Sequence, residues 1–139
     1  MFTSFKSLLV LGAILSLLIG CTASHHHQQG EHAKVKTIMK DHVNLKPSDS
    51  HEECFAFKKG QILVYKFSSS RPVDFNIHYH GKDQVHYPVS NSAITADDGI
   101  IDPATHHYYM EDQEYYCLMW ENTEMISAHI SYECEVRDK

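Results

Sequence analysis

The chain has 139 residues, 42% of them hydrophobic, and a formal net charge of −6 with neutral histidines. This length suits one domain with one buried core. The acidic balance and the lack of any cluster of Lys and Arg in the sequence argue against nucleic-acid binding, which needs basic patches to neutralise phosphates.

The first 20 residues have the pattern of a secretory signal peptide, in which Lys6 is followed by an apolar run from Leu8 to Ile19. That run is shorter than the roughly 20 residues a transmembrane helix needs. It ends in the sequence LIGC, which resembles the lipobox of bacterial lipoproteins. The resemblance implies cleavage before Cys21 and acylation of its thiol, with palmitate among the lipids. Two or three acyl chains hold a protein stably on a membrane surface.

Cleavage would remove Lys6 with residues 1–20 and change the net charge from −6 to −7. The residue after Cys21 is Thr22, and the resemblance to Gram-negative lipoproteins then implies the outer membrane, with the protein facing the periplasm. We divide the chain into the signal peptide (1–20), a lipidated cysteine with a histidine-rich linker (21–50) and a folded domain (51–139). The linker carries His25, His26, His27 and His32, which act either as loose metal chelators or as a polar spacer.

Residues 34–45 fit a short helix or a strand, and residues 46–53 have the composition of a loop. From Cys54 onward the hydrophobic period is two, which is typical of β-strands. Residues 69–72 (SSRP) predict a turn, and residues 90–104 predict a loop with a short strand near Ile94 or Ile100. The pattern predicts an all-β domain, an antiparallel β-sandwich. The expected strands span residues 60–69, 73–80, 84–89, 114–122 and 126–136.

The last two expected strands form a hairpin in this prediction. Its register is set by matching apolar faces, because a slip of one residue would turn every side chain to the other face. Trp120 then lies near Ile130, and Leu118 lies near Tyr132.

Three cysteines remain after Cys21, so one intramolecular disulfide leaves one thiol over. The hairpin register places Cys117 and Cys134 on opposite faces, which disfavours a bond between them. Cys54 with Cys134 is the candidate pair, and Cys54 with Cys117 is the alternative. We expect the third thiol to be a buried core residue.

Three histidines lie in the segment VDFNIHYHGKDQVHYPV, residues 73–89. A hairpin with a three-residue loop at 81–83 keeps its apolar residues on one face. On the other face this register sets His78 opposite His86, with His80 two residues away. The apolar pairs of this register are Tyr79 with Val85 and Ile77 with Tyr87.

Opposed Cβ atoms lie about 4.5–5.5 Å apart, so these three imidazoles could bind one ion. Zinc or copper suits imidazole ligands best. The alternatives are solvent-exposed histidines without a ligand and a pH-sensing cluster. Candidates for a fourth ligand are His106, His107, His129, Cys117, Met119 and water.

Catalysis is not expected. Cys117 lies in an aromatic strand and not on a turn that would expose a nucleophile, and the sequence has no glycine-rich phosphate loop. A metal-dependent hydrolase built on the three histidines would need an acid or base such as Asp83 or Glu121.

The segment GQILVYKFSSSRPVDFNIHYHGKDQVHYPV, followed by EYYCLMWENTEMISAHISYECEV, resembles the GOLD-type β-sandwich of secretory-pathway cargo receptors and their bacterial look-alikes. The resemblance covers residues 54–136 and rests on an F-x-I strand before a hairpin and an aromatic strand that closes on Asn122. It implies a non-catalytic interaction domain. The His-x-His pair at 78 and 80 is absent from the eukaryotic pattern.

The expected function is therefore that of a lipid-anchored cell-envelope protein with a non-catalytic binding module, whose partner is a protein of the envelope. The alternative is a periplasmic zinc- or copper-binding protein that uses His78, His80 and His86. The metal-dependent hydrolase is the third reading.

Overall fold

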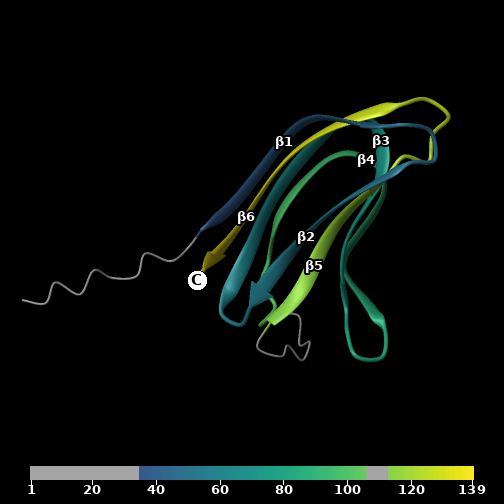
Figure 1. Cartoon of the computed structure of the whole chain (residues 1–139). Helices are drawn as coiled ribbons and strands as arrows, with labels where there is room; N and C mark the ends of the chain where they lie inside the picture. The colour runs from purple at the N-terminus through teal and green to yellow at the C-terminus, as the bar shows by residue number, and fades with distance from the viewer. Residues whose placement is uncertain (1–34, 106–112) are drawn as a thin grey trace, which may run out of the picture. The chain divides into compact units, whose positions relative to one another are not determined.

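The structure is a computed structural model and describes residues 35–105 and 113–139. Every regular element in these two ranges is a β-strand, and all strand pairs are antiparallel (Figure 1), which confirms the all-β prediction. The strands are β1 (Lys36–Leu45), β2 (Ser50–Lys58), β3 (Gln61–His80), β4 (Val85–Ile101), β5 (Gln113–Glu121) and β6 (Ala128–Asp138).

The strands form one curled sheet in the order β1-β6-β3-β5-β2, and β4 pairs with β3. The long strand β3 connects two halves of this sheet. Its residues 61–69 pair with β6, and its residues 74–79 pair with β5. Figure 1 shows β1 with β6 and β2 with β5 as two neighbouring groups of strands, while β3 belongs to both.

The predicted turn at 69–72 is wrong, because this segment lies inside β3. The predicted turn nevertheless coincides with an irregularity in the pairing of β3. The register with β4 shifts between Ser68 and Val73, and Pro72 has no N–H to donate to a neighbouring strand. At this position β3 stops pairing with β6 and begins to pair with β5, and the chain keeps its direction. The predicted loop at 90–104 is wrong in the same way, since β4 continues to Ile101 along β3.

The first strand lies in the segment that was assigned to the linker. β1 pairs with β6, and its Leu45 is buried. Strand β2 begins at Ser50, inside the predicted loop. The two edge strands approach each other through side chains, because Lys36 Nζ of β1 lies 5.3 Å from the ring centroid of Phe55 of β2. The folded part of the chain thus includes residues before position 51.

The core contains the side chains that alternation assigned to it. On β3 the apolar set from Val73 to Tyr79 is buried, and on β5 and β6 both predicted faces are buried. The exceptions lie on β4, where Val85 and Tyr87 are exposed although they were expected inside. The confirmed core residues are Val73, Phe75, Ile77, Tyr79, Tyr116, Leu118, Trp120, Ile130, Tyr132 and Cys134.

The predicted hairpin between the last two strands is wrong, because β5 pairs with β2 and β3, and β6 pairs with β1 and β3. The two strands meet instead through side chains. The rings of Trp120 and Tyr132 stack with their centroids 4.6 Å apart. The face assignment was right although the pairing was not, since alternation specifies a side chain's face and not the neighbouring strand.

Asn122 ties the chain together where β5 ends. Its side chain is buried, and Nδ2 lies 3.0 Å from the carbonyl oxygens of Leu45 and Lys46 and 2.9 Å from that of Ile126. Its Oδ1 accepts a hydrogen bond from the backbone N–H of Glu124. One amide therefore pairs with four backbone groups, two at the end of β1 and two in the loop between β5 and β6.

We expect Asn122→Ala to lower the free energy of unfolding by about 1–3 kcal/mol, because it leaves backbone groups without their partner. Urea unfolding followed by circular dichroism measures the loss. Asn91→Ala is the matched control. Asn91 is exposed, and its Nδ2 donates a hydrogen bond to the carboxylate of Asp97. We expect the control to change stability by about 0.5 kcal/mol or less. Equal effects of the two substitutions would contradict the role of Asn122.

Candidate functional site

Three residues of neighbouring strands lie in one row across the sheet. Cys54 of β2 pairs with Cys117 of β5, and Cys117 pairs in turn with His78 of β3. Side chains alternate along a strand, so all three lie on the face opposite the core. Their neighbours along the chain include the buried core residues Phe55, Ile77, Tyr79, Tyr116 and Leu118.

The row contains the disulfide of the domain, which joins Cys54 to Cys117. The candidate pair Cys54 with Cys134 is therefore wrong, and the alternative is right. The physical reason is the strand order. β2 lies beside β5, whereas Cys134 is on β6 and points into the core on the other face. Cys134 is a free buried thiol, as expected for the leftover cysteine, and burial raises its pKa to about 12.

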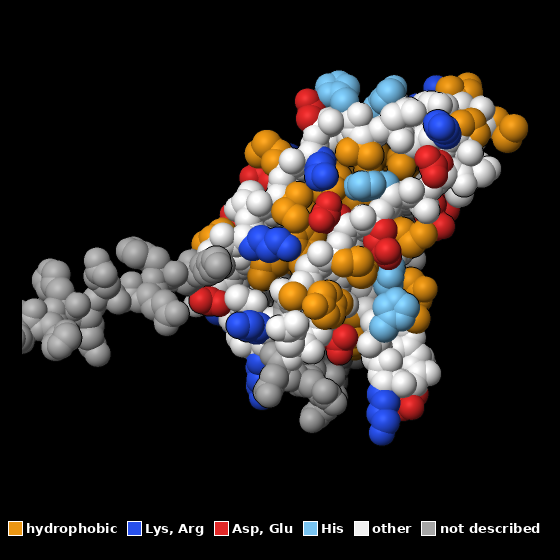
Figure 2. Space-filling view, in the orientation of Figure 1, with side chains coloured by type: hydrophobic (Ala, Val, Ile, Leu, Met, Phe, Trp, Pro, Cys, Tyr) orange, Lys and Arg blue, Asp and Glu red, His pale blue; other side chains and the backbone are white. Residues whose placement is uncertain are grey.

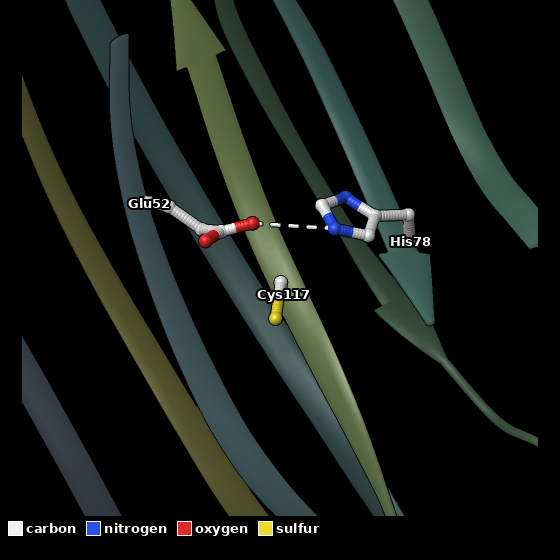
Figure 3. A group of neighbouring side chains, drawn as sticks. All are labelled: Glu52, His78 and Cys117. Atoms are coloured by element: carbon white, nitrogen blue, oxygen red, sulfur yellow. Dashed lines mark ion pairs between the residues drawn. The ribbon is translucent and has the colours of Figure 1, made fainter. Parts of the chain in front are cut away.

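Glu52 joins the row because it is two residues before Cys54 on the same face of β2. Its Oε1 lies 3.2 Å from Nε2 of His78, and Cys117 lies beside both (Figure 3). The nearest potential ligand atoms of Glu52, His78 and Cys117 all lie within 4.8 Å of one another. We name these three residues together with Cys54 the cysteine–histidine row.

The imidazole of His78 is held in one orientation. Its Nδ1 lies 2.8 Å from Oδ1 of Asn76, an oxygen that can only accept, so Nδ1 carries the proton. Nε2 is therefore the ring nitrogen that faces Glu52. Burial lowers the pKa of His78, while the charge of Glu52 acts in the opposite direction and His80 adds to the lowering.

The predicted three-histidine cluster is not formed. His80 is exposed and its ring lies 5.5 Å from that of His78, so these two are together as expected. His86, however, pairs with Tyr79 and stacks on its ring at 4.7 Å, on the other face of β3. The predicted register is wrong because the ladder shifts between Ile77 and Tyr79, so that Ile77 pairs with Val89.

The hairpin loop itself explains where His86 packs. The backbone N–H of Gly81 donates to the carbonyl of Gln84, which makes the loop one residue longer than predicted. A Cβ on Gly81 would lie 2.7 Å from Nε2 of His86. The lack of a side chain at 81 thus leaves room for the imidazole against the backbone. Metal binding by the chain stays a prediction, but His78 and His86 cannot share one ion in this arrangement.

A second polar cluster lies on the core face, where β2 meets β6. The hydroxyl of Tyr132 donates to Oε2 of Glu53 at 2.8 Å and lies 2.9 Å from Nε2 of His51. Burial raises the pKa of Tyr132, and Glu53 adds to this effect. Burial lowers the pKa of His51, against the charge of Glu53. The sequence alone revealed neither Glu52 nor this cluster. The alternation in SHEECFAF becomes visible once residues 50–57 are taken as a strand.

A shallow groove of about 320 Å³ lies over the β1–β6–β3 half of the sheet. It borders the bulge of β1, where the register shifts between Lys40 and Val43 and His42 has a φ of 53°. A hydrogen bond from Ser131 and the neighbouring His42 hold the pKa of Asp41 below its usual value. The lining residues are Met39, Lys40, Asp41, Lys66, Phe67, Ser68, Ser131, Tyr132 and Glu133.

Several residues named from the sequence lie outside the described ranges. They are Cys21, His25, His26, His27, His32, His106 and His107. Within residues 35–105 and 113–139 there is no helix long and apolar enough to span a membrane.

Comparison with solved structures gives a match to the crystal structure of the Yersinia pseudotuberculosis-derived mitogen. The TM-score is 0.45 and the identity 8%, over 77% of this chain and 87% of that chain. No protein-family model matches the chain, and neither does any curated protein. The function is therefore inferred from the sequence and from the site.

Proposed function

We propose that the chain is a lipid-anchored protein of the cell envelope whose β-sandwich domain is a non-catalytic binding module for an envelope protein. The anchor is acylated Cys21, and the location is the periplasmic face of the outer membrane. The sandwich is supported by the bend of β3 and by the stacking of Trp120 on Tyr132, which brings strands from the two halves of the sheet into side-chain contact.

The observation that carries the binding role is an exposed aromatic surface beside the cysteine–histidine row. Tyr87 and Tyr115 are 56% and 57% exposed, and His80 is exposed as well. Tyr87 lies 5.7 Å from the ring of His78, which links it to the row. We call Tyr87, Tyr115, His78 and His80 the aromatic–histidine face. Figure 2 shows histidine beside hydrophobic side chains on the side where β5 and the β3–β4 hairpin lie.

This surface suits protein recognition for two reasons. Tyrosine combines a large apolar ring with a hydroxyl that can hydrogen-bond, and it is enriched at interfaces. The backbone beneath is rigid, because β3 pairs with both β4 and β5, and the disulfide joins β5 to β2. Rigid aromatic side chains lose little conformational freedom when a partner binds.

The binding role is tested by photo-crosslinking in cells. A photoreactive amino acid replaces Tyr87 or Tyr115, and Met39 is the control because it is 69% exposed on the other half of the sheet. We expect the same defined crosslinked product from positions 87 and 115 and none from position 39. Equal labelling at all three positions, or none, would contradict the assignment of this face.

The anchor is tested separately by Cys21→Ser. We expect wild-type protein in the membrane fraction and the variant in the soluble fraction or as uncleaved precursor without lipid. A fully processed, membrane-bound variant would show that the lipid is not the anchor. Metabolic labelling with palmitate gives a direct readout of acylation.

A further inference from the structure

We propose that reduction of the Cys54–Cys117 disulfide turns the cysteine–histidine row into a zinc site. Its ligands would be the two thiolates, Nε2 of His78 and one carboxylate oxygen of Glu52. This site differs from the three-histidine cluster, since it includes neither His80 nor His86. It does not depend on the proposed binding function.

The first argument is the convergence of ligand atoms. Bond lengths of about 2.0–2.3 Å place the ligand atoms of a tetrahedral zinc roughly 3.3–3.8 Å apart. Oε1 of Glu52 lies 3.2 Å from Nε2 of His78, and Cys117 Sγ completes a set within 4.8 Å. The sulfur of Cys54 lies outside this 4.8 Å set, but Cys54 lies directly opposite Cys117 in the ladder and on the same face. After the bond between the two sulfurs breaks, its side chain can turn toward the ion and supply the fourth ligand.

The second argument is the orientation of His78. Because its Nδ1–H is donated to Asn76, the ring directs Nε2 at a carboxylate oxygen of Glu52. A cation between Nε2 and this oxygen, either a proton or a metal ion, stabilises the contact. Histidine ligands of metals almost always donate their other N–H in this manner, which fixes the ring. Asn76 is thus a positioning residue.

The third argument is the chemistry of the change. In the disulfide each sulfur is bonded to the other, and neither is a thiolate. Cys54 is exposed, so a dithiol can attack the bond. Two electrons pass from the dithiol to the protein, the dithiol becomes a disulfide, and two cysteine thiols form. Zinc then binds both as thiolates, and two protons are released. Two thiolates, one imidazole and one carboxylate are ligands that zinc accepts.

The fold holds these ligands in place without the disulfide. Cys117 lies on β5, which pairs along its length with β2 on one side and with β3 on the other. These ladders set the spacing of Glu52, Cys54, Cys117 and His78 across three strands. Reduction therefore frees the sulfurs while the backbone stays in register.

The test is cobalt and zinc titration of the full chain in detergent, in a background with alanine at the linker histidines and at Cys134. That background removes the linker histidines as competing ligands and also the third thiol, that of Cys134 in the core. A phosphine keeps one sample reduced, and the other stays oxidised. We expect one equivalent of cobalt in the reduced sample, with a thiolate-to-cobalt absorption band, and displacement by zinc. The oxidised sample should bind at least about 100-fold more weakly and without the band. The linker positions are His25, His26, His27 and His32.

Variants distinguish the site from adventitious binding. His78→Ala should weaken binding at least about 100-fold, and Asn76→Ala by about 10–100-fold, the range for lost outer partners of metal ligands. His80→Ala is the matched control and should bind as the parent does. A reduced parent without the thiolate band, or a His78→Ala variant that binds equally well, overturns the proposal. If the reduced protein unfolds, zinc should restore its circular dichroism spectrum, and failure to do so overturns it too.

Discussion

Removal of the Cys54–Cys117 disulfide is expected to lower the free energy of unfolding by about 4 kcal/mol. The two cysteines are 63 residues apart in sequence, and a crosslink that closes a loop of this length restricts the unfolded chain by roughly that amount. The bond also joins the edge strand β2 to β5, so its loss removes a covalent link at this edge while the ladder between the two strands remains. A domain of this size is expected to have only about 5–15 kcal/mol of total stability.

The measurement is urea unfolding of the Cys54→Ala/Cys117→Ala variant against the oxidised parent, with a chelator present. Reduction of the parent should produce a similar loss, because Cys134 is already a free thiol. A loss below about 1 kcal/mol would mean that the crosslink restricts the unfolded state little. When the chelator is omitted, zinc at 100 times its dissociation constant should restore about 2.7 kcal/mol to the reduced parent and nothing to the double variant. Recovery in the reduced parent alone would show that zinc stabilises the domain by binding to the two cysteines of the proposed site.

Trp120→Ala is expected to lower the free energy of unfolding by about 3–5 kcal/mol. Trp120 is fully buried and stacks on Tyr132 at 4.6 Å. It also contacts the rings of Phe75 at 5.4 Å and Phe67 at 5.7 Å. These partners come from both parts of β3 and from β6. Truncation to alanine therefore leaves a cavity where the two halves of the sheet meet, and strands on both sides lose packing.

Circular dichroism during urea unfolding measures this loss, because the only tryptophan of the chain is removed by the substitution. Trp120→Phe should lie between the parent and Trp120→Ala, since it keeps an aromatic ring in the cavity. Met39→Ala is the exposed control, with an expected change within about 0.5 kcal/mol. If Trp120→Ala were as mild as this control, the contact between the halves would not stabilise the domain.

The side-chain faces of the central strands could be predicted from the sequence because alternation is local. Every second residue from Val73 to Tyr79 on β3 and from Tyr116 to Trp120 on β5 is a buried apolar side chain, as the period of two requires. The same rule predicted that Cys117 and Cys134 face opposite ways. The rule failed on β4, where the shift of register after Ile77 turned Val85 and Tyr87 outward. A bulge is a single extra residue, and no composition signal in this hairpin revealed it.

Pairing between strands was the part that local patterns missed. Ser69 to Pro72 have turn composition, yet β3 continues through them because β6 and β5 pair with it on either side of the bend. Residues 50–53 have loop composition, yet they pair with β5. Backbone hydrogen bonds to a neighbouring strand outweigh a local propensity of this size.

The sequence by itself determined a set of candidate ligands, namely the histidines of the 73–89 segment and the cysteines after Cys21, and it placed Cys117 and Cys134 on opposite faces. It did not reveal Glu52, and it placed His86 on the wrong face. Only the tertiary structure decided which of them meet. His78 faces Glu52 and Cys117, whereas His86 lies on Tyr79 and Cys134 lies in the core. The reason is physical: alternation is set by the backbone geometry of one strand, but a row of ligands across three strands depends on strand order and register, which the packing of the whole sheet selects.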